Sequence, residues 1–343
     1  MSAAEPAPRA AVVAPAGLEL SQEERDLYVR LPPAGFILFA RNCATPAQVT
    51  ALVASLREAG GRVDAPVLID QEGGRVARLR PPSWPDFPAL SRIGDLAAAR
   101  PREAEEAAFL HARLIAHGLA AHGIDVDCAP CLDVRDPDGH DVIGDRSYSG
   151  DAATVTALGR AAIDGFLAGG VLPVLKHLPG HGRGRVDSHA SLPEVDAGLA
   201  DLEARDFVPF RALAGAPMAM TAHIRYKALD PERPATLSGT IVRDVIRGSI
   251  GFRGTLFTDD ISMGALAGDL STRTRQALAA GCDIALHCNG DLGESEAVLC
   301  AAGPLAGASR ERFEASLARR TAPALFDADR ARARLADLLT PVV

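Results

Sequence analysis

The stretch Val171–Lys176 reads VLPVLK, an apolar run that ends in a lysine and is followed by His177. Its length, its Val and Leu content and the glycines before it are typical of a buried parallel β-strand. Similar runs occur at Ala10–Ala14, Gly35–Phe39, Pro66–Asp70, Gly123–Cys131, Pro217–Ala222, Thr255–Thr258 and Cys282–Leu286. Segments of helical character lie between them, among them Pro101–His122, Ala152–Gly169 and Ser238–Ser249. This alternation predicts an α/β protein with a closed (β/α)8 barrel of the TIM type.

An open, doubly wound sheet is the alternative architecture, and it normally carries a glycine-rich phosphate loop after its first strand. The sequence Ala14-Pro15-Ala16-Gly17 is not such a loop. No low-complexity linker divides the chain, so we expect one catalytic barrel domain over residues 1–343 with Ala- and Arg-rich helices at its C-terminal end.

The composition excludes several classes of partner. With 36 Lys and Arg against 44 Asp and Glu, the net charge is -8, which argues against binding to nucleic acid or to an anionic membrane. We see no export signal and no apolar stretch long enough to span a bilayer. The 6 cysteines are expected to be buried free thiols of a reducing compartment, so we expect a cytoplasmic protein. We also expect it to act as a monomer.

Polar side chains stand at the ends of several of the predicted strands, where packing gives no reason for them. They are Asp70, His177, His223, Asp259, Asp260 and His287. In an eight-stranded barrel the carboxyl ends of the strands meet at one rim, where active sites are built. We therefore expect these side chains to form one shared site.

The segment from Lys176 to His189 contains three histidines among glycines and a proline, which indicates a shaped loop. Asp187 is close enough to His189 to hydrogen-bond one imidazole nitrogen and fix the tautomer, as a general acid and base requires. A loop tied down by hydrogen bonds is the structural alternative. A metal site is another, since His177, His181, Asp187 and His189 are competent ligands, although their spacing matches no short zinc pattern.

Two further segments favour chemistry on a polar substrate. Thr255–Thr258 is an apolar strand that runs into the carboxylates of Asp259 and Asp260, one of which can attack an electrophilic carbon while the other can cap the helix that follows. Asp70–Arg78 combines an acid, a Gly-Gly turn and two arginines, which suits a clamp for hydroxyl or carboxylate groups. A salt-bridged loop explains this clamp equally well. Arg146 lies in another turn-rich loop.

The spacing of Cys128 and Cys131 resembles that of a redox pair, but the cysteines of such pairs lie at the start of a helix, next to the end of a strand. Here both cysteines fall in the apolar run between Ile124 and Val134, so we expect them to be buried thiols inside a strand.

Taken together, the motifs resemble glycoside hydrolase family 3, and more narrowly its bacterial β-N-acetylhexosaminidases of cell-wall recycling. They are Asp70-Gln-Glu-Gly-Gly-Arg, Lys176-His177-x-Pro-Gly-His-Gly with Asp187-Ser-His189, and Thr-Asp259-Asp-Ile-Ser-Met. The likeness runs from about residue 10 to about residue 290 and keeps the order of the motifs.

The resemblance implies a retaining hydrolase that cleaves terminal N-acetylglucosamine from a muropeptide or another N-acetylglucosaminide. It assigns Asp259 as the nucleophile and His189, assisted by Asp187, as the acid and base. It assigns sugar binding to Asp70, Arg78, Arg146, Lys176 and His177. No metal and no organic cofactor is expected. A metal-dependent barrel hydrolase, a family 3 enzyme with β-glucosidase specificity and a non-catalytic sugar-binding barrel remain as alternatives.

Overall fold

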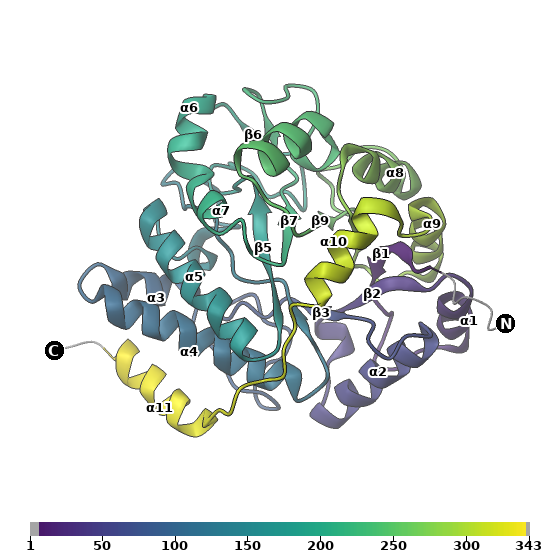
Figure 1. Ribbon diagram of the computed structural model, residues 1–343, viewed down its shortest axis with the longest axis horizontal. Coiled ribbons are helices and arrows are strands. Elements are labelled where there is room, and N and C mark those ends of the chain that lie inside the picture. Colours follow the sequence, from purple (N-terminus) through teal and green to yellow (C-terminus); the bar gives the residue numbers. More distant parts are fainter. Residues whose placement is uncertain (1–6, 341–343) are drawn as a thin grey trace.

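The parallel strands of the chain close into a barrel, as the computed structural model of residues 7–340 shows (Figure 1). Neighbouring strands follow the order β1-β10-β9-β7-β5-β4-β3-β2, and β2 pairs with β1 to close the ring. The strands are β1 (Arg9–Val13), β2 (Pro33–Leu38), β3 (Val67–Ile69), β4 (Val126–Asp127), β5 (Leu172–Leu178), β7 (Met218–Thr221), β9 (Thr255–Asp260) and β10 (Ile284–His287). The predicted (β/α)8 barrel is confirmed.

The helices surround the strands (Figure 1). They are α1 (Gln22–Arg30), α2 (Pro46–Ala59), α3 (Leu90–Ala97), α4 (Pro101–Ala120), α5 (Ala152–Ala168), α6 (Leu199–Asp201), α7 (Val208–Ala212), α8 (Leu270–Ala280), α9 (Leu292–Ala302), α10 (Gly307–Leu317) and α11 (Ala328–Leu339). Short 3-10 turns lie at η1 (Ala40–Asn42), η2 (Gly144–Arg146) and η4 (Ala235–Leu237). The segments η3 (Leu202–Asp206) and η5 (Ile241–Ser249) are π-helical, so the helix predicted at 238–249 forms with a wider turn. A small sheet pairs β6 (Glu194–Val195) with β8 (Arg225–Tyr226).

The barrel interior is a packed apolar core. Alternate strand residues point inward and form one buried cluster that includes Val12, Leu68, Val174 and Phe257, while their neighbours pack under the helices. At the amino end of the strands, Phe313 of α10 joins the inner cluster. Since apolar side chains fill this end, polar chemistry is left to the carboxyl ends of the strands.

The differences between β4, β5 and β9 and their predicted ranges bear on the site. The fourth is only Val126–Asp127, because the chain then reaches Pro130, which has no N–H to give to a ladder. In contrast, β5 and β9 continue into the polar residues that were expected just beyond them, including His177 and Asp259. These side chains therefore project from strand backbone that is held by pairing.

The cysteine predictions hold in part. Cys128 and Cys131 are buried free thiols as expected, but they follow β4 and do not lie within a strand. The expectation of burial is wrong for Cys300, which is exposed on α9, and for the half-buried Cys43. Within residues 7–340, no helix has both the length and the apolar character to cross a membrane.

A buried carboxylate at the amino end of the barrel ties α10 to the strands. Asp283 accepts hydrogen bonds from the backbone N–H of Leu256 at 2.9 Å and from the Arg247 and Arg312 side chains at 2.8 and 2.6 Å. Its side chain is 0% exposed. The carboxylate thus compensates two cations and orders three elements.

We expect Asp283→Asn to lower the free energy of unfolding by about 3 kcal/mol, the low end for a broken buried ion pair because Arg312 is partly exposed. Denaturant unfolding at neutral pH measures this loss. Glu314→Gln removes an exposed pair with Arg310 and is the control, with an expected change below about 0.5 kcal/mol. Equal effects of the two substitutions would contradict the role given to Asp283.

Candidate active site

A cavity of about 480 Å³ opens at the carboxyl ends of the strands, a volume in the range of small-molecule sites. Among the residues that line it are most of those predicted for the site: Asp70, Arg78, Arg146, Lys176, His177, His189 and Asp259. Asp187 does not line the cavity but is hydrogen-bonded to His189. The structure therefore brings the predicted residues together around one hollow.

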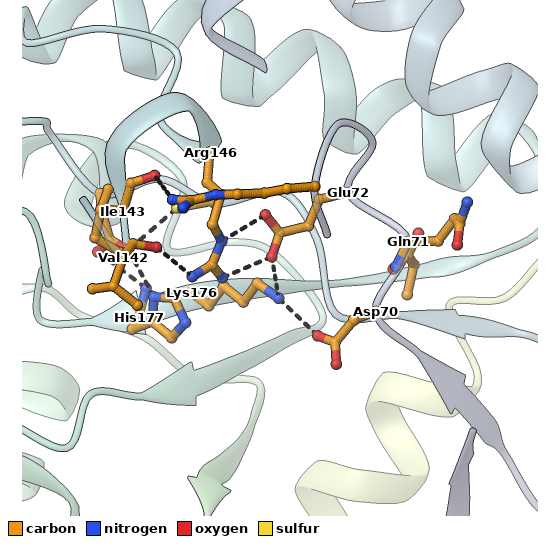
Figure 2. A network of polar contacts seen from close by, with 12 residues as sticks. Asp70, Gln71, Glu72, Val142, Ile143, Arg146, Lys176 and His177 are labelled. Atoms are coloured by element: carbon orange, nitrogen blue, oxygen red, sulfur yellow. Dashed lines mark hydrogen bonds and ion pairs between the residues drawn. The ribbon is translucent and has the colours of Figure 1, made fainter. Parts of the chain in front are cut away.

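A buried lysine forms the centre of the cavity floor (Figure 2). The Nζ atom of Lys176 lies 2.8 Å from Asp70 Oδ1 and 2.6 Å from Glu72 Oε1, and its side chain is 2% exposed. Lys176 comes from β5, whereas both carboxylates follow β3. The ammonium group thus joins the carboxyl ends of β3 and β5, the two strands on either side of β4.

An arginine extends this network at each end. Arg78 donates to Asp70 Oδ2 at 3.0 Å, and Arg146 donates to both carboxylate oxygens of Glu72, at 3.0 and 2.8 Å. Sequence reasoning did not assign Glu72 a role. Its position in the acidic stretch after β3 was the only signal, and that signal does not say which carboxylate meets a lysine from another strand.

Each carboxylate of the network stays ionised. Burial raises the pKa of Glu72, but Arg146 and Lys176 outweigh it and lower that pKa from 4.5 to about 2. The pKa of Asp70 is lowered in the same way by Lys176 and Arg78. Burial lowers the pKa of Lys176, but the two carboxylates raise it well above its ordinary value. The floor therefore holds fixed charges that can bind hydroxyl groups without changing protonation.

His177 is held by an acid that the sequence did not single out. Asp133 accepts from His177 Nδ1 at 2.7 Å and from the backbone N–H groups of His177 and His181 at 3.2 and 2.6 Å. Burial raises the pKa of Asp133, but His177 outweighs it, so the pKa is lowered. With Nδ1 engaged, the Nε2 edge of His177 is the one left for a ligand in the cavity.

The two adjacent carboxylates at the end of β9 have separate roles. Asp260 accepts from Ser262 N–H at 3.0 Å, from Ser262 Oγ at 2.6 Å and from the backbone N–H of Cys288 at 3.3 Å. It thus caps a turn, and the expected cap of the following helix is wrong, because Asp269 caps α8. The Asp259 carboxylate accepts only from the Asp260 N–H, at 2.8 Å, among the contacts that the structure describes.

Histidines keep Asp259 ionised. Burial raises the pKa of this carboxyl, but His223 and His177 together with the Asp260 N–H outweigh it, so the pKa is lowered. His223 is fixed behind it by Thr236 and by the Asp260 carbonyl, at 2.7 and 3.0 Å. The expectation of one shared site fails for His287, which is buried toward Glu294 of α9, 3.8 Å away. Its side chain leaves β10 on the helix side, where no cavity contact is possible.

Asp187 and His189 form a pair on the loop after β5. Asp187 Oδ1 lies 2.7 Å from His189 Nδ1 and accepts from the His189 backbone N–H at 2.9 Å. Burial raises the pKa of Asp187, but these bonds outweigh it and lower that pKa. The His189 side chain is 67% exposed, so its Nε2 can exchange protons with solvent and with a ligand.

The four side chains considered as metal ligands from the sequence do not form one cluster in the structure. In the described part of the chain, one group of three metal-competent side chains is close-packed: Cys131, Asp133 and His177. Of the four ligands weighed from the sequence, only His177 belongs to it. These three side chains are already joined by hydrogen bonds, since Asp133 also accepts from Cys131 Sγ at 3.2 Å.

Comparison with known proteins gives consistent matches. A family model described as the N terminal domain of glycosyl hydrolase family 3 matches residues 11–320. The chain is 41% identical over 281 residues to a β-hexosaminidase of Stenotrophomonas maltophilia, covering 81% of this chain and 82% of that relative. The crystal structure of NagZ from Neisseria gonorrhoeae superposes with a TM-score of 0.81 at 31% identity, covering 98% of this chain and 99% of that one. The same protein has been solved in complex with N-trifluoroacetyl-D-glucosamine, again at a TM-score of 0.81, 31% identity and 98% and 99% coverage.

The buried network predicts loss of stability in acid. Because the folded pKa of Glu72 lies below its ordinary 4.5, its contribution is complete above pH 4.5 and is lost as the pH falls toward 2. We expect the free energy of unfolding of the wild type to drop over this interval. Glu72→Gln should show a smaller drop, and at pH 7 it should be less stable by about 3–5 kcal/mol.

Denaturant unfolding at several pH values measures both effects. Glu296→Gln, which removes an exposed partner of Arg30, is the matched control and should keep the wild-type pH dependence. If the Glu72 variant kept that dependence as well, its carboxylate would not be the titrating group.

Proposed function

Because this chain belongs to family 3 of the glycosyl hydrolases, we propose that it is a retaining β-N-acetylhexosaminidase that releases terminal β-linked N-acetylglucosamine from peptidoglycan-derived muropeptides. The observation that carries the proposal is the shared cavity, which is lined by the free carboxylate of Asp259, the exposed imidazole of His189 and the buried clamp around Lys176. An attacking group, a proton donor and a rigid binding floor are what glycoside hydrolysis requires.

The floor of the cavity binds the sugar. The Asp70 carboxylate accepts hydrogen bonds from ring hydroxyl groups, and Arg78, Arg146 and Lys176 donate to sugar oxygens. The Nε2 edge of His177 adds one more polar contact. Because the charges of the clamp are held by one another, few groups reorganise when the substrate enters.

In the first step Asp259 attacks the anomeric carbon as His189 gives its proton to the glycosidic oxygen. The bond between that carbon and the departing oxygen breaks through an oxocarbenium-like transition state, and a covalent glycosyl-enzyme forms. In the second step His189 takes a proton from water, which attacks the same carbon and releases Asp259. Two displacements on one carbon retain its configuration.

Asp187 supports both steps. Its bond to His189 Nδ1 leaves Nε2 as the nitrogen that gives and takes the proton. In its deprotonated form the imidazole is neutral, so it does not repel carboxylates on the substrate. Arg41 and Arg75 also line the cavity, and guanidinium groups suit the carboxylates of a wall fragment.

The proposal extends to the setting of the enzyme. We place it in the cytoplasm as a monomer with one catalytic barrel domain and no metal or organic cofactor. Its free cysteines support a reducing compartment.

An assay of substrate preference tests the specificity. We expect turnover of an aryl β-N-acetylglucosaminide and of a wall-derived disaccharide to exceed turnover of the matching aryl β-glucoside by tenfold or more, about 1.4 kcal/mol in the transition state. Comparable turnover of the glucoside would favour the β-glucosidase alternative. Complete inactivation by a chelator, reversed by zinc, would favour the metal-dependent alternative.

Replacement of the attacking carboxylate tests the nucleophile. Asp259→Asn keeps the size of the side chain but removes its charge, so we expect kcat on the aryl N-acetylglucosaminide to fall by about 10⁴-fold or more. The neighbouring Asp260 is engaged in capping its turn and should not substitute for it. Near wild-type rates in this variant would refute the assignment.

Replacement of the acid and base should depend on the leaving group. In His189→Ala we expect kcat/KM to fall by about 10²–10⁴-fold on the wall-derived disaccharide, which needs protonation. The loss should be much smaller on an aryl glycoside with a strongly acidic phenol as leaving group. Equal losses on both substrates would show that His189 is not the proton donor.

A further inference from the structure

The loop that carries His189 is held firmly at its two stems. On the β5 side, the N–H of His181 donates to Asp133 at 2.6 Å. Gly182 packs so closely that an added Cβ would lie 1.8 Å from the carbonyl oxygen of Val134. On the far side, the chain enters β6, which pairs with β8 through Glu194 and Arg225.

Arg183 donates to Asp206 at 2.8 Å and the His140 N–H donates to the Gly184 carbonyl at 2.7 Å, so the loop becomes exposed only from Arg185 onward. Val186 is 39% exposed, and the His189 side chain is also largely exposed. The backbone N–H of Gly264 donates to the His189 carbonyl at 3.1 Å, and that of Ala265 donates to the Ser188 carbonyl at 3.2 Å. The Ser188 hydroxyl adds a contact of 3.3 Å to His181 Nε2. The backbone of Ser188 and His189 is thus docked on residues 264–265.

At Gly264 the docking surface has no room for a side chain. A Cβ placed on Gly264 would lie 2.9 Å from the carbonyl oxygens of both His189 and Ala190, closer than real Cβ atoms approach other atoms. The φ angle of Gly264 is not in the left-handed region, so glycine is required here for close approach and not for conformation.

The docking surface is part of the segment that follows Asp259. Asp260 caps it through Ser262, and the Met263 N–H donates to the Asp260 carbonyl at 3.1 Å. From α8, Arg273 donates to the carbonyl oxygens of Ile261 and Met263 at 2.8 and 3.2 Å. One segment, residues 259–265, therefore carries both the attacking carboxylate and the amides that bind the acid–base loop, which is the loop between β5 and β6 that carries His189.

We propose that Gly264 and Ala265 are positioning residues, whose backbone amides set the His189 imidazole at its working distance from Asp259. The inference rests on the proposed function, because it assigns the proton transfer to His189. The amides act on the reaction through the loop and touch no substrate. A methyl group at residue 264 displaces the carbonyls of the loop and with them the imidazole.

The test is Gly264→Ala. We expect kcat/KM on the wall-derived disaccharide to fall by about 100-fold, the cost of a misplaced catalytic group, with a much smaller loss on the aryl glycoside with the acidic phenol. KM on the aryl glycoside should change little, since the binding floor is untouched. This dependence on leaving group should match that of His189→Ala, which a general loss of structure would not reproduce.

Gly118→Ala is the matched control, because a Cβ on this helix residue of α4 meets nothing within 4 Å. It should keep wild-type rates on both substrates. If Gly264→Ala kept them as well, or lost both substrates equally while remaining folded, the positioning role would be wrong. If instead the wild type cleaved no N-acetylglucosaminide, the proposed function itself would fail.

A second measurement does not depend on the folding of the Gly264→Ala variant. Amide hydrogen exchange at Gly264 and Ala265 should be slowed relative to an open loop, and Ser188→Ala should speed it by removing the contact to His181. Exchange at the rate of free peptide in the wild type would show that the loop is not docked, and would overturn the inference.

Discussion

The ammonium group of Lys176 is the charge on which the rest of the site depends. A lone cation in this position would be excluded by the cost of desolvation, so burial is tolerated only because Asp70 and Glu72 meet it within hydrogen-bond distance. Those two carboxylates in turn order Arg78 and Arg146. A single buried charge thus fixes the ends of β3 and β5 and the turn at η2 relative to one another.

The two reacting groups stand on different kinds of support. Asp259 extends from a paired strand and is kept ionised by neighbouring imidazoles, so the attacking group is ready before the substrate arrives. His189 belongs to an exposed loop and is oriented by Asp187, its neighbour on the same loop. The protein therefore holds the binding groups and the nucleophile on buried strand ends and places the proton carrier on an exposed loop.

Much of the fold and of the cavity lining was predictable, because both depend on local sequence patterns. The strand alternation predicted the barrel, and the motifs around Asp70, Lys176 and Asp259 predicted which residues line the cavity. Glu72 and Asp133 were missed, since their roles come from partners on other strands that no local pattern identifies. The docking of the loop that carries His189 could not be predicted either. The donors are backbone N–H groups, which every residue except proline has, so no sequence pattern marks them.

The hydrogen bonds that dock the loop of His189 are weak enough to allow substrate entry and product release. Two neutral hydrogen bonds and the Ser188 contact each contribute about 1 kcal/mol, so the loop is favoured in its docked position by only a few kcal/mol. Such a difference leaves an open state populated at roughly 0.1–10%, enough for a disaccharide to enter and leave. A latch made of side-chain ion pairs in a dry site would hold the imidazole more firmly but would slow product release. Weak, directional backbone bonds give His189 a defined position without closing the cavity.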